Sequence, residues 1–166
     1  MSAVRRHAFV LVAAGLLLTG TVRGQQRTGQ GGQWTPLDPV RFGPHLGYNF
    51  DAQALALGAQ VTLPITQHIE VYPSFDYYFI DPGSLWALNA DVKFQPPTRL
   101  GVLYVGGGLN YLHQSVGPLS SGDVNLNLLG GLEFRRRPFV PFVEGRLILG
   151  NGSAFQVVGG FNFQLR

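Results

Sequence analysis

Hydrophobic and polar residues alternate with a period of two along most of this chain. In the first such segment, Phe42, Leu46 and Tyr48 share one face and His45 lies on the other. Alternation of this kind predicts a β-strand with one apolar and one polar face. The pattern recurs eight times, in residues 42–50, 55–63, 69–79, 86–95, 103–111, 125–134, 141–149 and 155–165. We therefore expect eight strands and no helix after residue 41.

The segments between these strands also alternate in kind. Tight turns are expected at residues 64–68, 96–99 and 136–138. They interleave with connections at residues 51–53, 81–84, 113–123 and 150–153. An even number of up-and-down strands places the two termini of the chain on one side of the barrel. The longest loop, His113 to Asp123, is then expected on the other side.

Periodicity alone leaves open whether the apolar face points into a core or into lipid. A soluble carrier has an apolar lumen, whereas a membrane barrel has an apolar exterior. The interior of an eight-stranded barrel is just wide enough for side chains to fill it. The apolar face carries too many rings to fit there: Phe42, Tyr48, Phe50, Phe75, Tyr77, Phe79, Trp86, Phe94, Tyr111, Phe134, Phe155, Phe161 and Phe163. The volume of these rings favours an exterior that faces lipid.

The positions of the aromatic residues and the low charge give the same answer. The rings gather near the two ends of the strands and flank an aliphatic band, as the two interfaces of a membrane require. Charged residues make up 13% of the chain, whereas a soluble surface carries about 25–35%. The sequence thus predicts an all-β fold, an eight-stranded antiparallel up-and-down transmembrane β-barrel, over residues 40–166. A soluble periplasmic carrier is the alternative fold.

The N-terminus has the features of an export signal. Arg5 and Arg6 precede an apolar run, residues 8–18, that is too short to span a bilayer. Small or uncharged residues follow, and cleavage is expected after Gly24. We interpret residues 1–24 as a Sec signal peptide, and the Gly-, Gln- and Pro-rich residues 25–39 as a flexible lead-in.

Charge and cysteine content exclude several classes of function. Residues 1–24 take three of the 12 cationic residues with them, so nine remain against nine acidic ones. No basic surface is left for nucleic acid. The chain has no Cys, which excludes disulfides, thiolate metal sites and a Cys nucleophile. No two histidines have the spacing of a metal site, and we expect no cofactor.

Three segments carry a resemblance to a known family. They are the glycine-rich residues 103–111, residues 129–135 and the Glu144-Gly145-Arg146 segment at 141–146. Over residues 41–166 the chain resembles the small outer-membrane β-barrels of the OmpA and OmpX types. That resemblance implies the outer membrane of a Gram-negative-type cell as the location. It also implies membrane lipid and the barrel assembly machinery as partners, and a structural role in the envelope.

Charged residues on the polar face are the first group of candidate functional residues. They are Glu70, Asp76, Asp91, Lys93, Glu133, Glu144 and Arg146. Glu70 is expected opposite Lys93, and Glu144 beside Arg146. A charged pore constriction is one interpretation. We favour a paired polar network that fills the lumen, because buried charges must be paired and water-filled channels need about 16 strands.

His113-Gln114-Ser115 is the segment that suggests catalysis. Lipid A deacylases are also eight-stranded outer-membrane barrels, and this chain resembles them in having a His-x-Ser on a strand. Asp123 is the carboxylate expected to orient the histidine. We therefore expect a non-enzymatic integral barrel, with a lipid A hydrolase using His113 and Ser115, or a channel for a small solute, as the alternatives.

Overall fold

The computed structural model describes residues 37–96, 103–134 and 139–165. The expected signal peptide, most of the lead-in, the turn expected at 136–138 and most of the turn expected at 96–99 lie outside these residues. In the described chain, no helix is long and apolar enough to cross a membrane. The strands found there are β1 (Arg41–Asn49), β2 (Ala54–Pro64), β3 (Ile69–Tyr78), β4 (Ser84–Phe94), β5 (Leu103–Val116), β6 (Leu119–Glu133), β7 (Phe139–Leu149) and β8 (Ser153–Gln164).

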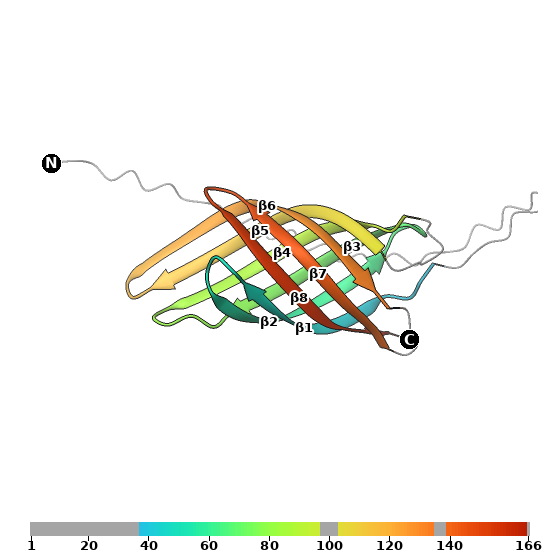
Figure 1. Ribbon diagram of the computed structural model, residues 1–166, viewed down its shortest axis with the longest axis horizontal. Coiled ribbons are helices and arrows are strands. Elements are labelled where there is room, and N and C mark those ends of the chain that lie inside the picture. The colour runs from blue at the N-terminus through green and yellow to red at the C-terminus, as the bar shows by residue number, and fades with distance from the viewer. Residues whose placement is uncertain (1–36, 97–102, 135–138, 166) are drawn as a thin grey trace, which may run out of the picture. The chain divides into compact units, whose positions relative to one another are not determined.

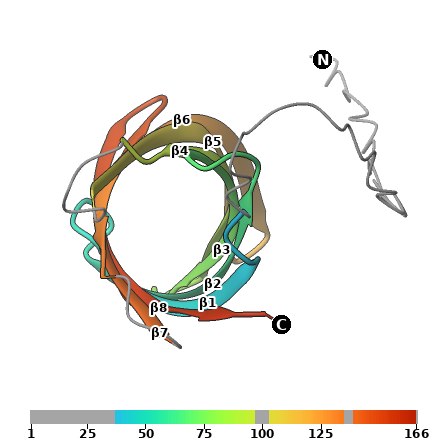
Figure 2. The same cartoon turned by 90° about the vertical axis from the view of Figure 1, so that its right-hand side faces the viewer.

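The strands form one closed antiparallel barrel in sequence order (Figure 1). Figure 2, an end-on view, shows the ring that they make. Strands β1 and β8 close it, with Leu46 opposite Gly159. The two ends of the described barrel meet where the backbone N–H of Leu165 donates to the carbonyl of Val40 at 2.9 Å. The predicted fold class is confirmed.

Side-chain exposure shows which face of the wall points outward. Exposed and buried residues alternate along β1 without interruption. The exposed positions are apolar: Leu46 is 62% exposed, Leu57 50% and Leu126 57%. The buried positions include most of the charged residues of the strands. A surface of this kind is stable in hydrocarbon and not in water, so the apolar exterior is that of a membrane-spanning barrel.

Aromatic rings gather at both ends of the apolar band. On the side of the β1–β2 and β7–β8 turns, Phe50 stacks on Phe155 with ring centroids 5.7 Å apart. On the side of the termini, Phe139 meets Phe163 edge-on at 5.3 Å. These are the two interface belts that the sequence predicts.

The predicted loop from His113 to Asp123 is wrong. Strands β5 and β6 continue pairing up to Val116 and Leu119, and only Gly117 and Pro118 turn the chain. Gly117 has a φ of 58°, a conformation that glycine adopts without strain. The Gly, Pro and Ser residues suggest a loop, yet the serines pair across the hairpin and extend the ladder. Figure 1 shows this hairpin extending past the β1–β2 and β7–β8 turns.

Candidate functional site

The polar face of every strand meets inside the barrel. Buried side chains there include charged, amide and hydroxyl groups from all eight strands, with the exposed apolar residues on the outside. Charges removed from water must be paired or hydrogen-bonded. We therefore expect the buried charges of the lumen to be paired or hydrogen-bonded to one another.

A cluster of ion pairs fills the lumen near the side of the termini. Arg41 donates to Glu70 at 2.7 Å and lies 3.4 Å from Glu133. Glu133 also lies 4.0 Å from the Nζ of Lys93. Glu70 and Lys93 are register partners on β3 and β4. Arg41 is absent from the sequence-predicted set, although it shares the parity of Gly43 and His45 on the same strand.

Three aromatic rings surround the Lys93 ammonium. Its Nζ lies 3.3 Å from the ring centre of Tyr72, 4.2 Å from that of Tyr104 and 5.7 Å from that of Phe142. Glu144 lies 3.6 Å away. Cation–π contacts are strongest where water is excluded, and this Lys93 side chain is fully buried. The rings thus stabilise a cation that the described lumen holds without a hydrogen bond at Nζ.

Arg146 is the central cation of the lumen. It donates to Glu144 at 2.9 Å and to Asp76 at 3.4 Å, and lies 3.6 Å from Asp91. Asp76 also meets His45 Nε2 at 2.7 Å. One guanidinium thereby links β7 to β3 and β4 across the barrel. These contacts hold the walls together as well as neutralising charge.

Amide side chains continue the network towards the hairpin of β5 and β6, which we call the long hairpin. Asn127 donates to Asp91 at 3.0 Å and to Asn89 at 3.0 Å. Asn110 donates to Asn89 at 2.7 Å, and Asn125 donates to Asn110 at 3.1 Å. Amides both donate and accept, so they pass hydrogen bonds from the central charges to the rim without adding charge.

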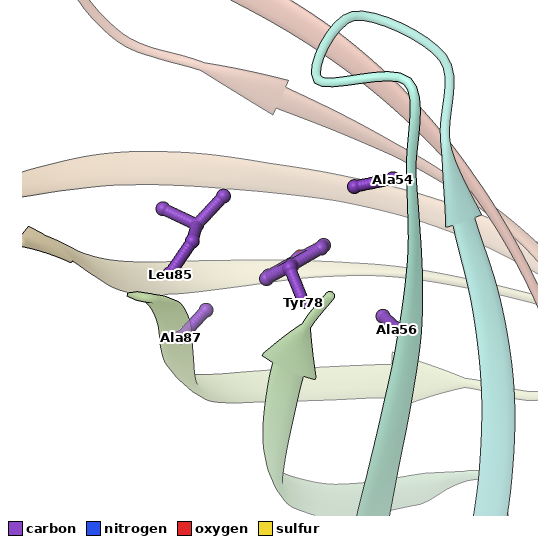
Figure 3. Packing of buried hydrophobic residues seen from close by; sticks show 5 residues of the cluster. All are labelled: Ala54, Ala56, Tyr78, Leu85 and Ala87. Carbon is purple, nitrogen blue, oxygen red and sulfur yellow. The ribbon is translucent and has the colours of Figure 1, made fainter. Parts of the chain in front are cut away.

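A small apolar cluster lies in the lumen on the same side as the long hairpin. Figure 3 shows its members: Ala54, Ala56, Tyr78, Leu85 and Ala87. Tyr78 is 1% exposed, and its hydroxyl donates to Gln156 on β8 at 3.1 Å. Leu129 and Ile148, which interrupt the polar face in the sequence, are likewise buried inside.

Glycines on the inner face leave room for the larger side chains. A Cβ at Gly58 would overlap the imidazole of His45, and one at Gly131 would overlap the phenol of Tyr104. Overlaps of this size cannot be relieved by small shifts in a packed interior. The glycines of these strands therefore provide the space that the larger side chains of the network occupy.

The His113, Ser115 and Asp123 residues do not form a catalytic triad. Register pairs Asp123 with Leu112 and His113 with Gly122, so Asp123 lies on the opposite face of the sheet from His113. His113 instead stacks on Trp86, with ring centroids 4.9 Å apart. Among the described residues, no hydrogen bond or ion pair joins His113 to a carboxylate, and no cluster of metal-ligating side chains is present.

The fold of this chain is found in solved structures of other proteins. No protein-family model matches the sequence, and no curated protein matches it. Solved structures do. The N-terminal β-barrel domain of Pseudomonas aeruginosa OprF matches with a TM-score of 0.67 at 16% identity, covering 78% of this chain and 100% of that one. The chain has the fold of the small outer-membrane β-barrels.

Two further solved structures share the fold of this outer-membrane-type barrel. Neisserial surface protein A has a TM-score of 0.55 at 12% identity, covering 76% of this chain and 94% of that one. The outer membrane enzyme PagL has a TM-score of 0.53 at 8% identity, covering 75% and 99%. These neighbours confirm the predicted resemblance and support the predicted outer-membrane localisation. At such identities they show the fold and no activity.

The central role of Arg146 gives a stability prediction. Arg146→Met leaves the carboxylates of Glu144, Asp76 and Asp91 buried without their shared cation. We expect this change to lower the free energy of unfolding by about 3–5 kcal/mol. Urea titration in phospholipid vesicles, followed by tryptophan fluorescence, measures it. Arg146→Lys keeps the charge, so its loss should be smaller. An Arg146→Met barrel as stable as the parent would contradict the role.

Proposed function

We propose that this protein is an integral outer-membrane barrel with a structural role in the envelope, and without a general pore or enzymatic activity. The observation that carries this proposal is the lumen, where polar and charged side chains join strands that are not neighbours in the barrel. Arg146 on β7 reaches Asp76 on β3. Gln60 on β2 donates to Asn162 on β8 at 2.8 Å.

Filling of the lumen is what argues against a channel. Tyr104 on β5 donates to Glu144 on β7 at 2.9 Å, and Asn127 on β6 donates to Asp91 on β4. A solute crossing the barrel would have to break several such bonds at once. Each leaves a buried polar group unpaired, which costs about 1–3 kcal/mol. These costs favour a permanently filled interior.

The proposed route to the membrane follows from the sequence. Residues 1–24 would direct export by the Sec pathway, and the barrel assembly machinery would insert the strands. Membrane lipid is then the principal partner of the apolar exterior. This part of the proposal is tested by the location of the protein after fractionation of an expressing Gram-negative host.

Two activities suggested by neighbouring structures find little support in this chain. The Ail protein of Yersinia pestis, with a TM-score of 0.52, is described in complex with the heparin analogue sucrose octasulfate. The described turns on the same side of the barrel as the long hairpin carry Asp51 and Asp81 and no Lys or Arg. An acidic surface repels a sulfated ligand. PagL is an enzyme, but here the carboxylate proposed to orient His113 lies on the wrong face.

A conductance measurement tests the filled lumen. We expect the purified barrel, inserted into planar lipid bilayers, to add no current above that of the bare bilayer. The matched comparison is the double variant Glu144→Ala/Arg146→Ala, which removes the central bridge and should admit measurable current. Stable single-channel steps from the parent protein would contradict the proposal and favour passage of a small solute.

Lipid A analysis tests the absence of hydrolysis. Lipid A from a host that produces this barrel should keep the same acyl chains as lipid A from a host that lacks it. Mass spectrometry of the extracted lipid makes the comparison. Loss of one acyl chain with the parent barrel but not with Ser115→Ala would establish the hydrolase and overturn the proposal.

A further inference from the structure

Asn151 differs from the other asparagines of this chain in its surroundings. The chain has seven asparagines. Six of them lie in strands and have side-chain amides that take part in hydrogen bonds of the barrel: Asn49, Asn89, Asn110, Asn125, Asn127 and Asn162. Asn151 lies in the turn between β7 and β8 and is exposed. Within the described chain its side chain has no hydrogen-bond partner, so its amide is free to rotate.

The turn that holds Asn151 is short and has a glycine on each side of it. Leu149 pairs with Ser153. Between them, Gly150, Asn151 and Gly152 alone reverse the direction of the chain. The N–H of Gly150 donates to the carbonyl of Gly152 at 2.9 Å, whereas the N–H of Gly152 itself donates no hydrogen bond to the described residues. The nitrogen that follows Asn151 therefore belongs to an exposed residue and is unpaired.

Packing explains the glycine before Asn151 but not the glycine after it. A Cβ at Gly150 would overlap the side-chain oxygen of Asn125. At Gly152 an added Cβ would meet no atom within 4 Å, and the φ angle of this residue is not positive. An alanine thus fits at this position without strain. What glycine provides there is open access to its backbone nitrogen.

Asn151 and Gly152 together have the groups needed for deamidation through a cyclic imide. When solvent hydroxide removes the proton of the Gly152 nitrogen, that nitrogen can attack Cγ of Asn151. A nitrogen–carbon bond forms, and the side-chain nitrogen leaves as ammonia after taking a proton from water. Water then opens the imide at either carbonyl, which gives aspartate or isoaspartate. In total, one water is consumed and one ammonia is released.

The asparagines in the strands lack both requirements of this reaction, a free amide and an accessible nitrogen. The amide of Asn89, for example, donates to Ser74 and Asp76. The residue after it, Ala90, is paired in the sheet. A paired residue cannot move its nitrogen towards the preceding side chain unless the strand opens locally. We propose that Asn151 is a site of spontaneous deamidation, and that in the folded barrel it reacts ahead of every asparagine in a strand.

The reaction changes the charge at the end of the barrel opposite the termini. The turn that holds Asn151 lies beside the β1–β2 turn. There the Phe155 N–H donates to the Asp51 carboxylate at 2.7 Å, and the Phe50 N–H donates to the Phe155 carbonyl at 2.9 Å. Deamidation turns a neutral position of this rim into a negative one, and so acts as a charge-changing modification. It requires neither a pore nor an enzymatic activity of the barrel.

Peptide mass spectrometry of the aged barrel tests the proposal. The protein is kept folded in phospholipid vesicles at neutral and at mildly alkaline pH, and samples are quenched in acid over time. Tryptic cleavage after Arg146 gives a peptide, residues 147–166, that contains both Asn151 and Asn162. Relative to the sample taken at time zero, we expect Asn151 to gain one mass unit while Asn162 does not. The gain should be faster at the higher pH, because the Gly152 nitrogen must lose its proton.

Two variants test the part that Gly152 plays. Gly152→Ala fits the turn, so the barrel should still fold, but the added methyl group hinders the backbone nitrogen. We expect deamidation at Asn151 to slow at least several-fold in this variant. Ser153→Ala, one residue later, should deamidate at close to the parent rate. A protein-isoaspartate methyltransferase should label the aged parent and not the fresh protein, because ring opening yields isoaspartate.

Four results would each overturn the modification site. Two of them are the absence of a mass gain at Asn151 during the incubation, and an equal gain at Asn162. The other two are an unchanged rate in Gly152→Ala and the formation of aspartate without isoaspartate, since either means that the Gly152 nitrogen does not attack. All four leave the membrane barrel and its filled lumen intact.

Discussion

Backbone hydrogen bonding in a medium without water is the constraint on which this structure depends. Hydrocarbon offers no partner for an exposed N–H or C=O, so a sheet that crosses it must close on itself. Pairing of β1 with β8 provides that closure. A closed wall with alternating side chains then has one face in lipid and one in a narrow lumen. The apolar exterior and the charged interior are two consequences of the same ladder.

Closing the sheet into a barrel also creates a narrow interior that side chains must fill. Eight strands leave a space too narrow for a water-filled channel, and too polar to collapse as an apolar core. The described interior carries five carboxylates, and Arg41, Lys93 and Arg146 are placed among them. Hydrogen bonds from Arg146 cross the lumen, so the side chains inside the barrel also connect its strands to one another. A barrel held together in this way is suited to a permanent place in the membrane.

Much of the fold was predictable from the alternation of residues, because the period of two survives from residue 42 to residue 165. The extended hairpin was not, since Gly117, Pro118 and the serines around them resemble a loop until their cross-strand pairing is known. The inner position of Glu144 and Arg146 follows from parity. Their bonds to β3, β4 and β5 do not, because contacts across a lumen depend on shear and tilt. Strand register also places Asp123 and His113 on opposite faces of the sheet. Their closeness in the sequence does not reveal this.

The central claim is that the apolar face of the barrel points outward into lipid and the polar face points into the lumen. Spin labels on β4 test it most directly. The chain has no Cys, so single-cysteine variants from Trp86 to Phe94 can each carry one label in lipid vesicles. Collision with dissolved oxygen, which concentrates in hydrocarbon, should peak at Leu88, Ala90 and Val92 and fall at Asn89 and Asp91. Peaks at Asn89 and Asp91 would mean that the barrel is turned the other way, with its apolar face inside.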